Sequence, residues 1–202
     1  MIFLKKDYKK VESILEQIDE IVLNLQHLLD HSKIILCTSP RHIEEKPYIT
    51  SEIAATYARQ GKRVLLIDAN FYFPLLHTIF QLSNSYGLSN LLLKRHSDWV
   101  PENTSIQNLF LLPSGPLPQP GSKWTLQYNL IQLLEECWEK YDYIFLNTPP
   151  VLEKLDTKIL AAACDGVVLF LKKNKTKKED TLKAIKQIKK AEDKFIGSIF
   201  LT

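Results

Sequence analysis

Continuous apolar runs, separated by segments with helical spacing, form the dominant pattern along this chain. Six runs read as strands, at residues 33–39, 62–69, 108–115, 141–149, 166–173 and 195–202. Most are apolar throughout rather than alternating, as expected for strands covered on both faces. Helical patterns lie between several of them, at residues 49–61, 124–141, 157–164 and within 172–194. The alternation predicts an α/β fold, in which a mostly parallel sheet is flanked by helices.

The first part of the chain predicts a long N-terminal amphipathic helix. Apolar residues recur at helical spacing from about Asp7 to Leu29. We therefore divide the chain into this helix (1–31) and one α/β domain (32–202), a length that suits a single domain overall. The apolar runs are too short to span a membrane, and the start of the chain does not read as a secretory signal, so a cytoplasmic location is expected.

Composition agrees with a soluble globular protein, since 45% of residues are hydrophobic and 24% are charged. Three widely separated cysteines, Cys37, Cys137 and Cys164, are expected to be reduced and buried. The five histidines are scattered and predict no metal site: His27, His31, His42, His77 and His96.

The net charge of +3 hides a strong local asymmetry. Residues 172–194 carry ten lysines and four acidic residues, a local charge of +6 that leaves −3 for the rest of the chain. Leu182, Ile185 and Ile188 recur at helical spacing, which predicts an amphipathic helix with a lysine-rich outer face. This face is either simply solvated or weakly attracted to an anionic membrane. Because no aromatic residues interleave with the lysines, no nucleic-acid partner is expected.

The carboxyl ends of three predicted strands carry the candidate chemistry, because ligands of such sheets bind beyond these ends. The three ends read "CTSPRHIEEKP", "IDANFYFP" and "LNTPPVL". A phosphate-binding loop uses glycines to wrap its main-chain N–H groups around phosphate oxygens, and a lysine to neutralise them. Here Lys46 stands at the expected place, but the loop before it has no glycine.

Five segments together resemble the bacterial tyrosine kinases of capsule and exopolysaccharide export. They are "GKRVLLIDAN", "GLSNLL", "LLPSGPLPQP", "YDYIFLNTPPVL" and "DGVVLFL", and the resemblance runs from roughly residue 33 to the end. That family belongs to the deviant P-loop ATPases, with the Min and Par partitioning ATPases. The resemblance implies a P-loop NTPase-like three-layer α/β/α fold, with the three strand ends as Walker A, Walker A′ and Walker B motifs that hold Mg-ATP.

The resemblance places the phosphate-binding loop at Glu44, Glu45, Lys46, Pro47 and Tyr48. Glu44 agrees with the family, but Glu45 stands where the family has glycine and brings a negative charge to an anion site. Pro47 replaces the Ser or Thr that coordinates magnesium, although it suits the first turn of a helix. An earlier glycine position holds Ile43, whose Cβ resists positive φ angles.

The metal-binding positions also depart from the family pattern. Asp68 matches the first aspartate of Walker A′ and is the retained carboxylate, whereas the second acidic position is Asn70 and the Walker B aspartate is Asn147. An amide lacks the charge with which carboxylates hold magnesium. A basic pair of the family reads Tyr72 and Phe73 here. We therefore expect no bound cofactor and no metal, with Mg-ATP the cofactor if the site still works.

Two of these residues have simpler interpretations. Lys46 is either a surface lysine near a helix start or a residual anion-binding group, helped by the helix N-terminus and Arg41. Asp68 is either a vestige of the metal site or an acceptor for neighbouring main-chain N–H groups. In the family's ring-forming motif, Glu16 and Asn24 fit, but the two arginine positions fall at Asp19 and Val22, which argues against the family's ring contact.

Three functions follow from this resemblance. The first is a non-catalytic relative of the tyrosine kinases, acting as a scaffold or regulator in capsular or exopolysaccharide biosynthesis and export. The alternative is an active ATP-dependent protein-tyrosine kinase with an atypical P-loop, and the second alternative is a Min/Par-type ATPase relative. The expected partner is a membrane-bound polysaccharide co-polymerase or activator protein, or a kinase paralogue, which would hold the chain at the inner face of the membrane.

Overall fold

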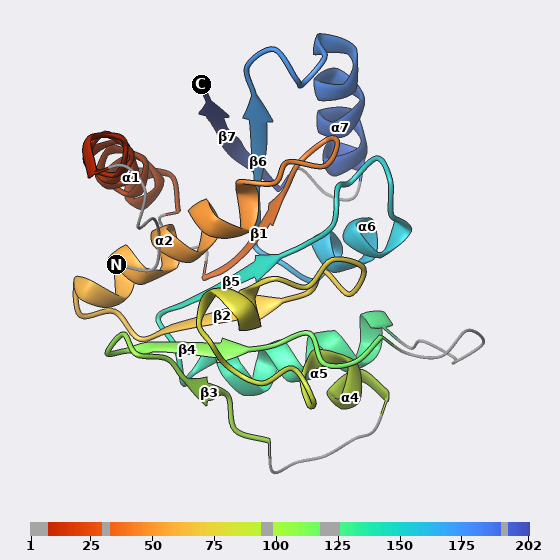
Figure 1. Cartoon of the computed structure of the whole chain (residues 1–202). Helices are drawn as coiled ribbons and strands as arrows, with labels where there is room; N and C mark the ends of the chain where they lie inside the picture. Colours follow the sequence, from red (N-terminus) through yellow and green to blue (C-terminus); the bar gives the residue numbers. More distant parts are fainter. Residues whose placement is uncertain (1–7, 30–32, 94–98, 118–125, 191–193) are drawn as a thin grey trace.

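Seven strands form one sheet through the middle of the molecule, as seen in a computed structural model that describes residues 8–29, 33–93, 99–117, 126–190 and 194–202 (Figure 1). The strands in these ranges are β1 (Ile34–Thr38), β2 (Val64–Asp68), β3 (Glu102–Asn103), β4 (Leu109–Leu112), β5 (Tyr143–Asn147), β6 (Gly166–Lys172) and β7 (Phe195–Leu201). The helices are α1 (Tyr8–Leu29), α2 (Lys46–Arg59), α3 (Leu76–Ile79), α4 (Leu88–Leu93), α5 (Leu126–Trp138), α6 (Leu155–Ala162) and α7 (Lys178–Lys190).

The strand order is β3-β4-β2-β5-β1-β6-β7, and every neighbouring pair is parallel except β3 with β4. The predicted mostly parallel sheet is therefore confirmed, as are the six predicted strands. Sequence periodicity did not predict β3, α3 or α4, which are two, four and six residues long. Elements this short lack enough residues to show a period.

Helices cover both faces of the sheet, which confirms the predicted three-layer arrangement (Figure 1). On one face, α1, α2 and α3 enclose a core that includes Val22 and Ile53. On the other face, α4, α5, α6 and α7 enclose a second core that includes Leu130, Leu160 and Ile188. The central strands are therefore buried on both faces, which explains why they appear as continuous apolar runs in the sequence.

Helix α1 packs against α2 and contributes to the core of the domain. Val22 is completely buried there, so this ring-motif position faces the chain's own interior. Asp19 and Asn24 are exposed, and the side chain of Glu16 lies outside the described residues. The division of the chain at residue 31 stays a prediction.

The cysteines Cys37, Cys137 and Cys164 are free thiols, and all three are buried as predicted. Burial raises the pKa of Cys37 to about 11, so this thiol stays protonated at neutral pH. Among the described helices, none combines the length and the apolar character that crossing a bilayer requires.

Candidate functional site

Three central strands end side by side, and their register brings the candidate residues into one row. Asn147 of β5 pairs with Cys37 of β1 on one side and with Asp68 of β2 on the other. The parallel arrangement puts all three carboxyl ends at the same edge of the sheet, where ligands of such folds bind. Asp68 and Asn147 are both completely buried.

Lys46 reaches this row from the first turn of α2. Its side chain is only 3% exposed, so the interpretation as a surface lysine is wrong. Nζ donates hydrogen bonds to the side-chain oxygen Oδ1 of Asn147, to the main-chain oxygen of Thr148 at 2.8 Å and to that of Cys37 at 3.3 Å. An ammonium group has three N–H donors, and all three are therefore used inside the protein.

Asn147 links the lysine to the retained carboxylate. Its amide nitrogen Nδ2 donates to Oδ1 of Asp68 at 3.0 Å, while its oxygen accepts from Lys46. Asp68 also accepts three main-chain N–H groups, from Asn70 at 3.2 Å and from Leu75 and Leu76 at 3.0 Å each. The interpretation of Asp68 as an acceptor for neighbouring main-chain N–H groups is confirmed.

The charges of this buried cluster balance without an ion. One ammonium, Lys46, and one carboxylate, Asp68, flank the neutral amide of Asn147. Burial lowers the pKa of Lys46 to about 8, which still leaves the lysine mostly charged at neutral pH. Burial also raises the pKa of Asp68, while the N–H groups around its oxygens act in the opposite direction. A third charge here would need its own partner.

The loop between β1 and α2 is held by one buried apolar side chain and two ion pairs. Ile43, at an expected glycine position, is 4% exposed and packs into the core. Glu45 forms an ion pair with Lys172 at the end of β6, and Arg41 pairs with Asp180 of α7 at 3.3 Å. No residue of this fully described loop has a positive φ angle. The backbone of this loop therefore does not need glycine.

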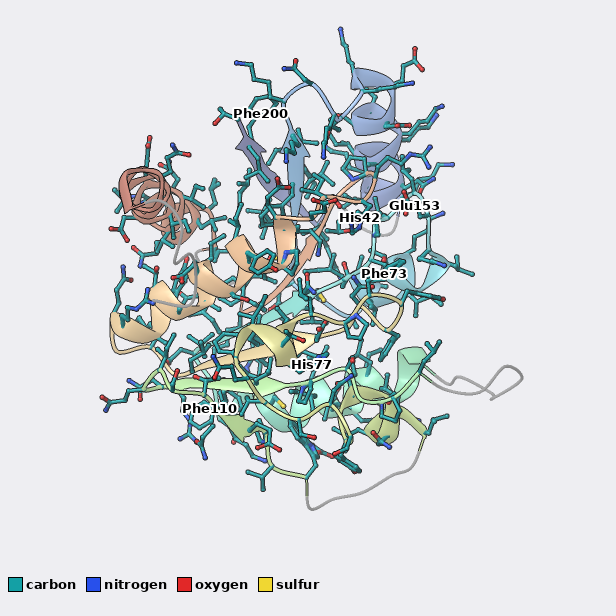
Figure 2. The ribbon with its side chains drawn as sticks, in the orientation of Figure 1. His42, Phe73, His77, Phe110, Glu153 and Phe200 are labelled. Atoms are coloured by element: carbon teal, nitrogen blue, oxygen red, sulfur yellow. The ribbon has the colours of Figure 1, made fainter. Side chains whose placement is uncertain are left out.

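Aromatic contacts tie three loops together above the strand ends. The rings of His42, after β1, and Phe73, after β2, lie 5.9 Å apart between centroids. The ammonium of Lys154, after β5, lies 3.6 Å from the ring centre of Tyr72. Figure 2 shows His42 and Phe73 close together, with Glu153 on the neighbouring loop. From the sequence, Tyr72 and Phe73 were interpreted only as replacements of a basic pair of the family. These contacts were not predicted.

The remaining predicted residues have separate places. Asn70 accepts a hydrogen bond from the main-chain N–H of Phe73 at 3.3 Å and so shapes the turn after β2. Pro47 lies in the first turn of α2, as predicted. Glu44 is exposed and Tyr48 is 36% exposed. The structure thus brings Lys46, Asp68, Asn70 and Asn147 together, but it leaves Glu44 and Tyr48 toward solvent.

Comparison with known proteins gives these residues a context. A domain family described as an AAA domain matches residues 46–198. The tyrosine-protein kinase YwqD of Bacillus subtilis is 34% identical over 168 residues, covering 83% of this chain and 71% of that protein. The tyrosine-protein kinase CpsD of Streptococcus agalactiae is 30% identical over 194 residues, covering 95% and 83%. This chain belongs to the bacterial tyrosine-protein kinase family.

Solved structures place this family member in the P-loop NTPase-like fold. The chimerical protein CapA2B2 superimposes with a TM-score of 0.84 at 26% identity, covering 92% of this chain and 83% of that one. MinD from Pyrococcus horikoshii, complexed with Mg-ADP, gives a TM-score of 0.70 at 20% identity, covering 83% and 69%. The second likeness supports the fold alone, and together they confirm the predicted fold class.

Mg-ATP is the cofactor that the family resemblance implies, and the present arrangement does not fit it in three respects. All three donors of Lys46 have internal acceptors, whereas a P-loop lysine donates to phosphate oxygens. Both oxygens of Asp68 accept N–H groups. Glu45 adds a carboxylate beside the loop.

Metal-binding side chains are also sparse. No three His, Cys, Asp or Glu side chains come together to hold a metal ion in the part of the chain that the structure describes. His31 and His96 lie outside the described residues.

Proposed function

We propose that this chain is a non-catalytic member of the tyrosine-kinase family, acting as a scaffold or regulator in capsular or exopolysaccharide biosynthesis and export. The observation that carries the proposal is the internal use of the Lys46 ammonium. Lys46 binds Asn147 and two main-chain oxygens at a buried position, so it stabilises the strand ends instead of meeting a phosphate.

Moving Lys46 to a triphosphate would take away the donor that the side-chain oxygen of Asn147 and the main-chain oxygen of Thr148 now have. Each buried polar group that loses its hydrogen bond costs about 1–3 kcal/mol. The Asp68 carboxylate would also lose its nearby positive charge, at a site where unpaired charge is more costly still. The incoming phosphates would carry more negative charge toward Glu45, and no glycine loop offers N–H groups to receive them.

The metal-binding positions support the same proposal. Magnesium favours carboxylate and hydroxyl oxygens, and in P-loop proteins it orders the phosphates during transfer. Asn70 and Asn147 are amides, and Pro47 has no hydroxyl group. Asp68 alone keeps a carboxylate, and its two oxygens are already occupied by N–H groups.

A non-catalytic family member acts through its contacts. The resemblance implies as partner a membrane-bound polysaccharide co-polymerase or activator protein, or a kinase paralogue, at the cytoplasmic face of the membrane. The tied loops after β1, β2 and β5 present a fixed surface for such a partner, since Phe73 is 70% exposed and Leu155 is 68% exposed. Both side chains are available for contact with a partner.

One observation favours the alternative of an active protein-tyrosine kinase with an atypical P-loop. Lys46, in the first turn of α2, and Asp68, at the end of β2, keep the charged groups of the family motifs, and both contact Asn147. The Min/Par-type ATPase alternative has only the likeness of fold to support it.

A phosphorylation assay separates these functions. The purified chain is incubated with radiolabelled Mg-ATP, a tyrosine-containing polymer and membranes of the native cell, beside a Lys46→Met variant. We expect no incorporation above that of the variant, together with recovery of a membrane protein or a kinase in a pull-down from the same cells. Incorporation that depends on Lys46 would favour the active kinase and overturn the proposal.

A further inference from the structure

We propose that the lysine-rich side of α7 and the turn before it form a docking surface for the anionic headgroups of a lipid bilayer. We call this surface the basic face and define it by seven exposed lysines, Lys173, Lys175, Lys177, Lys178, Lys183, Lys186 and Lys190. The inference goes beyond the proposed function, because it does not depend on the state of the Lys46 site.

The packing of α7 fixes which side of the helix faces outward. Ala184 and Ile188 are buried against the core, with exposed fractions of 0% and 2%. Lys183 and Lys186 therefore lie on the outer side with Leu182, which is 58% exposed. In Figure 2, nitrogen-tipped side chains project from α7 on the side away from the sheet.

Among the described residues, the ion pairs of the segment 172–190 leave its positive charge in excess. Within residues 172–190, the acidic residues are Glu179 and Asp180. Asp180 is paired with Arg41, outside this segment, at 3.3 Å, and Lys172 is paired with Glu45. These two pairs remove one charge of each sign from the segment, so the excess of lysine on the basic face is preserved.

Two exposed apolar side chains accompany the lysines. Ile199 of β7 is buried in the core on the α2 face of the sheet, so its neighbour Phe200 points to the opposite face, the one that carries α7. Phe200 is 60% exposed, and β7 adjoins the turn because the main-chain N–H of Lys173 donates to the oxygen of Leu201 at 2.8 Å. Leu182 and Phe200 thus add apolar groups of the kind that enter the boundary between headgroups and acyl chains.

The chemistry of the basic face favours a lipid surface over a nucleic acid. Residues 172–190 contain no arginine and no aromatic residue, and Phe200 on the adjoining β7 adds a single ring. The lysine ammonium is a compact charge that can interact with many headgroups without a fixed geometry. Nucleic acids are usually bound through bidentate arginine contacts and aromatic rings that stack on bases.

Vesicle sedimentation with purified full-length chain tests this surface. The probes are phosphatidylcholine vesicles with and without phosphatidylglycerol, and a short DNA duplex, each at low and high salt. The test variant is Lys183→Gln/Lys186→Gln, and the matched control is Lys62→Gln/Lys140→Gln, which removes the same charge from exposed positions elsewhere. Circular dichroism and the unfolding midpoint confirm that both variants are folded.

We expect binding to the phosphatidylglycerol vesicles alone, reduced by high salt. Each lysine near an anionic surface contributes about fivefold to partitioning, so the test variant should bind roughly 25-fold more weakly while the control binds like wild type. Equal binding by the two variants, or no preference for the anionic vesicles, would overturn the proposal. Tighter binding to the duplex than to the vesicles at equal salt would also overturn it.

Discussion

The ammonium of Lys46 donates a hydrogen bond to the side-chain oxygen of Asn147, and the amide nitrogen of Asn147 donates in turn to Asp68 at 3.0 Å. A neutral amide at this position lets one positive and one negative charge balance each other. With an aspartate at the same place, two carboxylates would face one ammonium, which would leave an unbalanced negative charge in the buried cluster. Asn147 thus makes the strand ends stable on their own.

Replacing Lys46 by methionine should destabilise the fold. The change leaves the buried carboxylate of Asp68 without its positive charge and the oxygens of Asn147 and Thr148 without a donor. We expect the free energy of unfolding to fall by about 3 kcal/mol, measured by urea denaturation near neutral pH. The exposed control Lys62→Met should change it by less than about 0.5 kcal/mol. A lysine reserved for phosphate would be removable at almost no cost, and that result would contradict a structural role.

The stability that Lys46 confers should increase with pH. Burial lowers its pKa in the folded chain from 10.5 to about 8. Between these values the unfolded chain holds a proton that the folded chain has released, so stability rises with pH. Relative to Lys46→Met, the free energy of unfolding of wild type should rise by about 1 kcal/mol from about pH 7 to about pH 9. A flat or falling difference would show that folding does not lower the pKa of Lys46.

The substitution Asn147→Asp should also lower stability. It turns the amide that donates to Asp68 into a second carboxylate at the same buried site. We expect a loss of about 2 kcal/mol at neutral pH, measured by denaturation in the presence of a chelator. The loss should shrink as the pH is lowered, because the two carboxyl groups then share a proton. The exposed control Asn174→Asp should be nearly neutral, and an equal loss in both variants would rule out the cluster as the cause.

The ion pair between Glu45 and Lys172 should contribute little to stability. The two side chains are 45% and 18% exposed, so water screens their attraction. Burial is the largest single influence on the pKa of Glu45 and raises it, but the hydrogen bonds that Glu45 accepts and the charges of Lys172 and Lys175 together lower the pKa overall. The contribution of the Glu45 carboxylate to stability is therefore present above about pH 4.5 and is lost as the pH falls further. Glu45→Gln should cost less than about 1 kcal/mol and lose that effect in high salt, with Glu44→Gln as control.

Much of the fold could be predicted from sequence because its strands are buried on both faces. Apolar runs such as "VLLID" and "GVVLFL" are typical of central strands. The helical segments between the runs predict that neighbouring strands are parallel. Helix α2 begins at Lys46, three residues before its predicted start at Ile49. The difference arises because Pro47 suits the first turn of a helix. The short strand β3 depends on its contact with β4 and has no sequence signal of its own.

The site was predicted as a set of residues but not as a network. The resemblance indicated Lys46, Asp68 and Asn147, yet nothing in the sequence tells whether a lysine at a helix start points to solvent or toward the sheet. That direction depends on acceptors from residues about a hundred positions away, at Asn147 and Thr148. The pairing of Glu45 with Lys172 is equally distant in sequence. Such contacts arise from the strand order β5-β1-β6, which only the folded chain defines.

Calorimetric titration of the wild-type chain with Mg-ATP tests most directly whether Lys46 is committed to the protein interior. The titration is repeated with Lys46→Met, and with a variant that combines Glu45→Gly, Pro47→Ser, Asn70→Asp and Asn147→Asp. We predict no saturable heat for wild type, and the same trace for Lys46→Met. Saturable, magnesium-dependent binding to wild type that Lys46→Met abolishes would contradict the proposed loss of the nucleotide site.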